Sequence, residues 1–302
     1  NANNTTAFAP TTSIIIAAPD LRVSSVVVPA TADSGEKVRV QWTVENVGTV
    51  AVWAGTQYWS DHVYISTEPA FSSRAIKLGY LIHSNATPLA AGGSYTASMD
   101  VPLPAGIEGP YFIHIITDGN EDPSSGLTRD VRIDTSPGSN PGSLNYYKTS
   151  VYEAGSYSNN YKAASLPVLY KEPDLVATSA IVPPTASSGQ PLTVSWTTTN
   201  QGARATRQSF WTDRIYLSLD SSLDLSDREL GTLDHTGILA QGASYTAGKT
   251  MDLPIGLSGT YYLLVFPDAT RGNALDSVPE FRGEGNNMKA QSITITLTGP
   301  IR

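Results

Sequence analysis

The stretch KVRVQWTVE, residues 37–45, alternates polar and apolar side chains around a central tryptophan, Trp42. Successive side chains of a strand point to opposite faces of its sheet, so the three valines and Trp42 would share one face. The stretch LTVSWTTT, residues 192–199, repeats the alternation around Trp196. A tryptophan centred on such a strand is typical of the buried layer of a β-sandwich.

The segments around these tryptophans recur in the same order along the chain. This self-similarity predicts two homologous domains, residues 19–170 and 171–298, after an N-terminal extension, residues 1–18. The spacing between the copies changes near their ends, which places an insertion within residues 119–148 of the first domain. The matching segments are Pro19-Asp20-Leu21 with Pro173-Asp174-Leu175, Trp59-Ser60-Asp61 with Trp211-Thr212-Asp213, Ser94-Tyr95-Thr96-Ala97 with Ser244-Tyr245-Thr246-Ala247, and Asn159-Asn160 with Asn286-Asn287.

Each repeat shows about seven short alternating runs separated by Gly, Pro and Asn turns, which predicts an all-β chain of two tandem immunoglobulin-like sandwiches. Charged residues make up only 15% of the chain, and no stretch keeps a helical period of apolar residues. The chain contains no cysteine. Disulfides and Cys-ligated metals are therefore excluded, and apolar packing must hold the two sheets of each domain together.

The formal net charge is −8, and no basic run occurs. This balance argues against nucleic acid or an anionic membrane as the partner. No apolar run is long enough for a membrane span. We therefore expect the partners to be other copies of the chain or a ligand on a cell surface or in a matrix.

The second domain carries phrases that resemble the CARDB family, the cell-adhesion-related domain found in bacteria. The resemblance implies an immunoglobulin-like fold, an extracellular or cell-surface location and a non-enzymatic role. The first domain is similar to a diverged member with an added loop. The phrases are PDLVATSAIVPPTASSGQPLTVSWTTTNQG at residues 173–202, WTDRIYLSLD at 211–220, LDLSDRELG at 223–231 and LPIGLSGTYYLLVFPD at 253–268.

Two groups of oxygen-bearing side chains are candidate Ca²⁺ ligands, since Ca²⁺ takes six to eight oxygens. The first is the acidic loop that holds Asp220, Asp224 and Asp227. Its spacing is not that of an EF-hand, and the alternative interpretation is a solvated turn rich in Asp and Ser. No other cofactor is expected.

The second group is a Glu…Asn-Asn motif that occurs in both repeats. Asp118 and Asp268 end the preceding strands and are placed to converge on it. The alternative interpretation is a structural turn, in which asparagine tolerates a left-handed backbone and the glutamate accepts from backbone amides. The motif comprises Glu153, Asn159 and Asn160 in the first domain and Glu280, Asn286 and Asn287 in the second.

The N-terminal extension contains Ile14, Ile15 and Ile16 in a strongly β-prone run. One hypothesis is that this run adds as a strand to a neighbouring molecule and so builds a filament. The other is that it packs on its own domain. The insertion within residues 119–148 is either a surface loop or a segment that contacts a partner.

Enzyme signatures are missing: the sequence has neither an H-E-x-x-H pair nor a G-x-S-x-G elbow. We expect His62 to be an exposed strand residue. The sequence thus predicts a non-enzymatic adhesion or structural module of a bacterial surface protein. The alternative function is a carbohydrate- or protein-binding module attached to a larger secreted enzyme.

Overall fold

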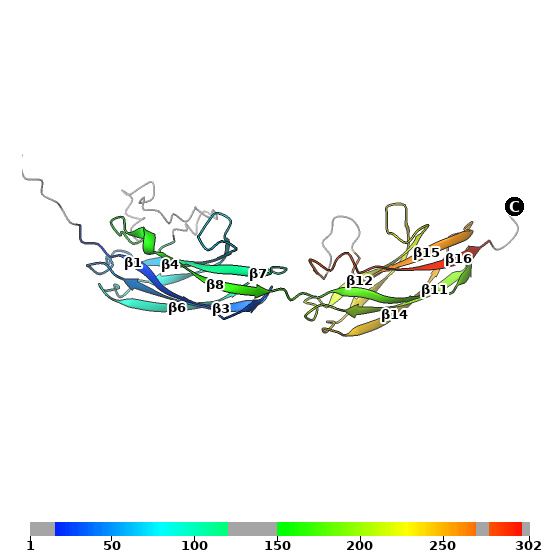
Figure 1. Ribbon diagram of the computed structural model, residues 1–302, viewed down its shortest axis with the longest axis horizontal. Helices are drawn as coiled ribbons and strands as arrows, with labels where there is room; N and C mark the ends of the chain where they lie inside the picture. Colours follow the sequence, from blue (N-terminus) through cyan, green and yellow to red (C-terminus); the bar gives the residue numbers. More distant parts are fainter. Residues whose placement is uncertain (1–15, 120–149, 270–277, 298–302) are drawn as a thin grey trace, which may run out of the picture. The chain divides into compact units, whose positions relative to one another are not determined.

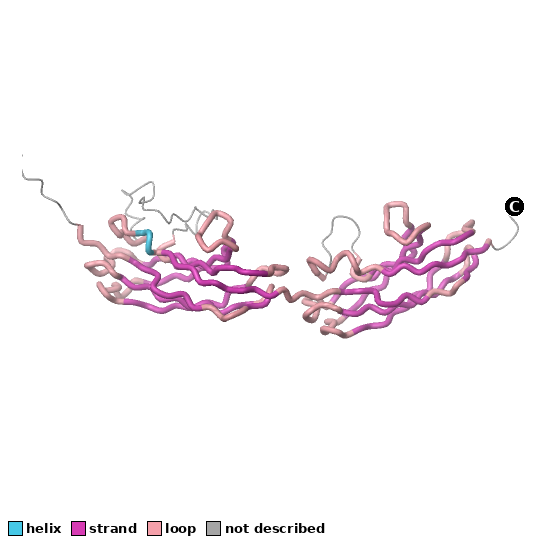
Figure 2. The backbone as a smooth tube through the Cα atoms, viewed as in Figure 1, coloured by secondary structure: helices cyan, strands magenta, loops and turns pink. Residues whose placement is uncertain are grey.

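The computed structural model describes residues 16–119, 150–269 and 278–297, in which strands joined by loops prevail (Figure 1, Figure 2). The chain divides into two units, one built mainly from residues before Leu169 and one mainly from residues after it. Both units are β-sandwiches, and the chain is all-β, as the sequence predicts. Most of residues 119–148, the predicted insertion, lies outside the described residues.

The first unit consists of a three-stranded sheet in the order β1-β3-β6 and a five-stranded sheet in the order β2-β8-β7-β4-β5. All the strand pairings given for β1 and for β3 to β8 are antiparallel. The strands are β1 (Leu21–Val27), β2 (Ala32–Asp33), β3 (Lys37–Asn46), β4 (Tyr58–Ser66), β5 (Ile76–Ser84), β6 (Ser94–Pro102), β7 (Gly109–Ile116) and β8 (Tyr161–Leu169), with a short helical turn, η2 (Tyr157–Asn159), before β8.

The second unit repeats this arrangement, with sheets in the orders β14-β11-β9 and β10-β16-β15-β12-β13. The short strand β10 lies at the edge of the five-stranded sheet and pairs in parallel with β16. The sequence patterns missed β2 and β10, because two or three residues are too few to show alternation. The strands are β9 (Leu175–Ile181), β10 (Thr185–Ser187), β11 (Pro191–Asn200), β12 (Phe210–Ser218), β13 (Arg228–Thr236), β14 (Ser244–Asp252), β15 (Gly259–Phe266) and β16 (Lys289–Thr296).

The alternating strands β3 and β11 place their apolar faces in the two cores. Trp42 and Trp196 are fully buried at equivalent positions of these strands. In the second unit, Trp196 packs with apolar residues of both sheets, among them Ile215 and Val265. Burial of each aromatic side chain removes on the order of 200 Å² from water, which makes the tryptophans major contributors to core stability.

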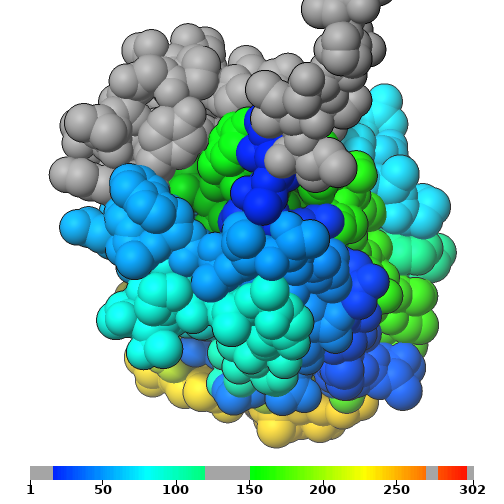
Figure 3. All heavy atoms as spheres, turned by 90° about the vertical axis from the view of Figure 1, so that its left-hand side faces the viewer, coloured from blue at the N-terminus to red at the C-terminus, as the bar shows by residue number. Residues whose placement is uncertain are grey.

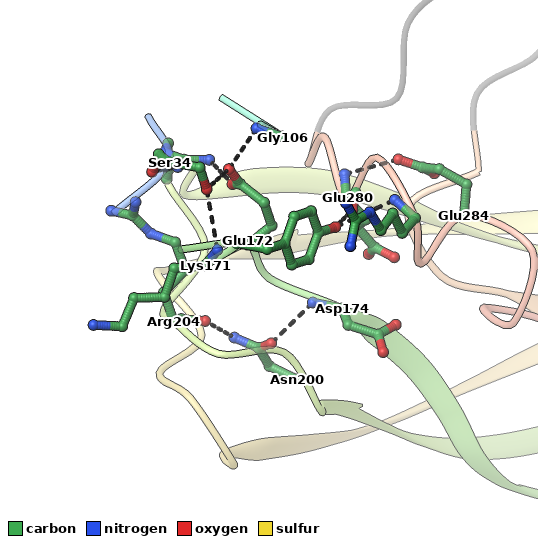
Figure 4. Close-up of polar contacts among 12 residues, drawn as sticks. Ser34, Gly106, Lys171, Glu172, Asp174, Asn200, Arg204, Glu280 and Glu284 are labelled. Carbon is green, nitrogen blue, oxygen red and sulfur yellow. Dashed lines mark hydrogen bonds and ion pairs between the residues drawn. The ribbon is translucent and has the colours of Figure 1, made fainter. Parts of the chain in front are cut away.

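An asparagine at the end of each of these strands fixes the following loop. The Asn200 side-chain amide donates to the Arg204 and Leu239 carbonyls at 2.7 and 3.0 Å, and its Oδ1 accepts from the Asp174 and Gly202 amides at 3.1 Å each. Figure 4 shows the bond from the Asn200 amide to the Arg204 carbonyl and the bond from the Asp174 amide to Asn200. Asn46 makes the equivalent four bonds in the first unit. Each asparagine thereby satisfies its full hydrogen-bonding capacity inside the protein.

Candidate functional site

The indole of each core tryptophan donates to a buried carboxylate, a network that the sequence patterns did not predict. The Trp42 indole donates to Asp61 Oδ2 at 2.7 Å, and the hydroxyls of Tyr95 and Thr117 also donate to this carboxylate. Asp61 is fully buried, and burial raises its pKa to about 6. The available signal was the repeat itself, because Trp-x-Asp recurs at residues 59–61 and 211–213.

The second unit builds the same network from the equivalent residues. The Trp196 indole donates to Asp213 Oδ2 at 2.7 Å, and the Tyr245 hydroxyl donates to both carboxylate oxygens at 2.8 and 2.7 Å. Burial raises the pKa of Asp213, and burial together with the Asp213 charge raises that of Tyr245. A buried indole N–H needs an acceptor, so these networks serve the core.

In the first unit, the Glu…Asn-Asn motif ties the loop before β8 to the start of β1. The Leu21 amide donates to Glu153 Oε2 at 3.0 Å, and the Asn160 side chain donates to Glu153 Oε1 at 2.7 Å. Asn159 instead donates to Asp20 Oδ1 at 2.8 Å. Both carboxylate oxygens of buried Glu153 are therefore hydrogen-bonded.

Asp118 belongs to the same end of the first unit. Its Oδ2 accepts from the Val151 amide at 3.0 Å, two residues before Glu153. Burial is the main cause that raises the pKa of Glu153 to about 9, and the Asp118 charge is the next. The predicted convergence of Asp118 on the motif is thus present in the first unit as an electrostatic contact.

The motif in the second unit lies at the start of β9 (Figure 4). The Leu175 amide donates to Glu280 Oε1 at 2.7 Å, and the Glu280 amide donates to Glu284 Oε1 at 2.8 Å. Asn286 is in contact with Asp174, its Nδ2 lying 3.3 Å from Asp174 Oδ2. Burial, followed by the charges of Glu284 and Asp174, raises the pKa of Glu280 to about 8.

Two further predicted ligands of the second unit surround this motif. Asp268 is buried, and its Oδ2 accepts from the Val278 amide at 2.7 Å, which parallels the bond from Val151 to Asp118. Asn287 is buried as well, and its side chain helps to hold the pKa of Glu280 below the value that burial alone would give. The structure therefore gathers the predicted motif residues of each unit at one end of that unit.

The acidic loop between β12 and β13 directs its carboxylates to its own backbone. Asp220 accepts from the Ser222 amide at 2.8 Å, Asp224 from the Ser226 amide at 2.7 Å and Asp227 from the Asp224 amide at 2.7 Å. These are the local bonds typical of Asp-rich turns. In the residues that the structure describes, no group of three or more His, Asp or Glu side chains is arranged to hold a metal ion.

The acidic loop is far from the Glu…Asn-Asn motif of its unit. Val278 packs against Trp211 at the start of β12, whereas the acidic loop follows Ser218 at the end of that strand. A strand of nine residues separates its ends by about 25 Å, so the two groups of candidate ligands cannot share one ion.

The end of the N-terminal extension lies beside the loop that follows β3 (Figure 3). The Thr49 amide donates to the Ala18 carbonyl at 3.1 Å. Ile16 and the exposed Trp53 line an apolar pocket of about 410 Å³ together with Val50 and Tyr152. The other predicted assembly residues, Ile14 and Ile15, lie outside the described residues.

The four histidines are packing residues. The expectation that His62 is exposed was wrong: His62 is fully buried, and its ring contacts Ser60 and Tyr64. The error arose because alternation of polar and apolar residues separates buried from exposed side chains only in a strand that has one of its two faces covered. His114 bonds to Ser66 and Tyr161, while the rings of His83 and His235 pack against those of Tyr95 and Tyr245.

No helix within the described ranges is long and apolar enough to cross a membrane. No curated protein sequence matches this chain significantly. Among solved structures, the CARDB domain of the PF1109 protein from Pyrococcus furiosus in complex with di-metal ions is similar, at 14% identity over 41% of this chain and 90% of that chain, with a TM-score of 0.31. A solution structure of the same domain aligns at 16% identity over 41% of this chain and 96% of that chain, with a TM-score of 0.31.

A β-glucosidase from Listeria innocua in complex with glucose is also similar, at 13% identity over 44% of this chain and 17% of the enzyme, with a TM-score of 0.26. Likenesses this low say nothing about what the present chain binds or catalyses. The CARDB family model matches residues 18–122 of this chain. The matched range falls in the first domain, whereas the phrases that resemble the family most closely in the sequence analysis lie in the second. The first of the two sandwich domains of this chain is therefore the part that matches the CARDB family model.

Proposed function

We propose that this chain is a non-enzymatic, extracellular adhesion or structural module of a bacterial surface protein. The observation that carries the proposal is the CARDB match at residues 18–122, because CARDB is a cell-adhesion-related domain family.

Antibody labelling of intact bacteria that produce the protein tests the location. A surface module should be labelled without permeabilisation and should be removed by brief protease treatment of whole cells. Labelling that requires permeabilisation would contradict the extracellular part of the proposal.

A finer form of the proposal is self-assembly, in which the isoleucine run of one copy adds to an edge strand of the next. Strand β5 ends the five-stranded sheet of the first unit and exposes Ile76, Tyr80 and Ile82. Natural edge strands usually carry charges that block such pairing. The second unit follows that rule, because Arg228, Thr232 and Asp234 occupy the matching positions of β13.

Electron microscopy and light scattering after size-exclusion chromatography test this assembly. The full chain should form rods, while deletion of residues 1–18 or the substitution Ile82→Asp should leave monomers. Ile181→Asp, which places the same charge on the exposed edge strand β9 of the second unit, is the matched control and should preserve the rods. A full chain that is monomeric at every concentration would rule out self-assembly.

The second candidate function is a carbohydrate- or protein-binding module, and one observation favours it. Trp53 is 58% exposed and lines an apolar pocket, whereas Trp42, Trp59, Trp196 and Trp211 are fully buried. Exposed tryptophans offer flat apolar faces on which sugar rings can stack. Because the other four are inaccessible, a change in fluorescence on adding an oligosaccharide would report Trp53, and Trp53→Ala should abolish it. An unchanged fluorescence spectrum would rule out sugar binding at Trp53.

A further inference from the structure

A group of buried oxygen atoms in the second unit lacks hydrogen-bond donors. Glu280 is fully buried, and its Oε1 accepts from the Leu175 amide, but its Oε2 has no hydrogen-bond partner. The same holds for Asp174 Oδ1 and for Oδ1 of buried Asn287. Buried polar atoms are nearly always paired, so unpaired acceptors on the segments before β9 and before β16 point to a missing positive partner.

The two carboxylate oxygens face the same space. A methyl group built on Gly283 would lie 2.9 Å from Asp174 Oδ1 and 2.9 Å from Glu280 Oε2. The absence of a side chain at Gly283 therefore keeps this space open between them. Asp174, Gly283 and Asn286 also line a pocket of about 410 Å³ in this unit, so the pocket borders this space.

The charged groups that act on Glu280 are carboxylates, and the hydrogen bonds from the Leu175 amide and the Asn287 side chain offset burial only in part. Burial disfavours its charged form, and the carboxylates of Glu284 and Asp174 disfavour it further. No lysine or arginine acts on Glu280 among the causes of its pKa shift. An uncompensated buried carboxylate is costly, and a bound cation would remove the cost.

The donor set consists of oxygens alone, which suits a hard cation, and Ca²⁺ tolerates the irregular arrangements that loops provide better than Mg²⁺ does. We propose that the second unit binds one Ca²⁺ ion in the space beside Gly283, with Asp174, Glu280 and Asn287 supplying side-chain oxygens. Bound there, the ion would fasten the loop before β16 to the start of β9.

The first unit provides a natural comparison. In its motif, Ser156 stands where the second unit has Gly283, and Tyr157 stands where it has Glu284. The Tyr157 hydroxyl accepts a hydrogen bond from the Glu153 amide at 3.2 Å. A neutral hydroxyl thus stands where the second unit has the Glu284 carboxylate. Both oxygens of Glu153 have donors, and only the amide oxygens of Asn159 and Asn160 remain unpaired. The proposal therefore concerns the second unit alone.

Isothermal titration of the full chain with CaCl₂, after treatment with EDTA and removal of the chelator, tests the proposal. The expected result is a single saturable site, with MgCl₂ competing weakly. Gly283→Ser, which introduces the residue of the first unit and leaves every carboxylate in place, should weaken Ca²⁺ binding by at least about tenfold. Glu280→Gln should do the same, while its amide oxygen still accepts from the Leu175 amide.

Matched controls come from the first unit and from the acidic loop. Ser156→Gly, Glu153→Gln and Asp224→Asn should all retain the affinity of the unmodified chain, and circular dichroism without Ca²⁺ should show that each variant is folded. The proposal is overturned if Ca²⁺ produces neither heat nor a change in Tm, if Gly283→Ser binds as well as the unmodified chain, or if Asp224→Asn abolishes binding.

Discussion

At the scale of single residues, the fold depends on two buried carboxylates, Asp61 and Asp213. Each accepts hydrogen bonds from a core indole and from a tyrosine hydroxyl. We predict that Asp61→Ala and Asp213→Ala each lower the free energy of unfolding by about 3 kcal/mol or more, because each buried donor left without an acceptor costs about 1–3 kcal/mol. Urea denaturation measures the loss. Asp220→Ala, in an exposed turn, should change stability by less than about 0.5 kcal/mol.

Asp61 also predicts a dependence of stability on pH. Its pKa in the folded protein is raised from 3.8 to about 6, so the folded state holds this proton more tightly than the unfolded state does. The stabilisation that follows is fully present below pH 3.8 and is lost as the pH rises through about 6. The two pKa values correspond to a difference of about 3 kcal/mol.

Comparison with Asp61→Asn isolates this contribution, because asparagine cannot titrate. The unmodified chain should gain stability relative to this variant when the pH falls from about 7 to about 4. A difference between the two proteins that stays constant over this range would show that the Asp61 pKa is not raised by folding.

At the scale of elements, the ends of β3 and β11 are held by Asn46 and Asn200. We predict that Asn200→Asp, which preserves the shape, destabilises the second unit by about 2–4 kcal/mol, since the carbonyls of Arg204 and Leu239 lose their donor and face a negative charge instead. Thermal unfolding measures the effect. Gln241→Glu adds the same charge at an exposed position and should leave the melting temperature nearly unchanged.

The sequence patterns located most strands correctly because alternation of apolar residues and turn residues reports directly on burial. They identified Trp42 and Trp196 as core residues for the same reason. They did not identify the hydrogen-bond networks, since the partners Asp61 and Tyr95 come from strands of different sheets, and their pairing depends on how the sheets face one another. The same limit applied to His62, whose burial depends on neighbours distant in the sequence.

At the scale of the whole molecule, one disulfide-free sandwich occurs twice along the chain. The first copy carries the CARDB match and the exposed edge strand β5, while the second carries the oxygen cluster around Gly283. Shared residues, such as the core tryptophans and the buried asparagines, maintain the fold. Residues that differ between the copies, such as Ser156 and Gly283, are where separate functions can reside.

The central claim is that Trp42 and Trp196 occupy equivalent buried positions, each donating to an aspartate. Hydrogen exchange of the indole N–H groups, followed by NMR in the folded protein, tests it most directly. The indole protons of Trp42 and Trp196 should exchange very slowly and at similar rates, while that of the exposed Trp53 should exchange quickly. If either core indole exchanged as fast as Trp53, the two halves would not share one core design.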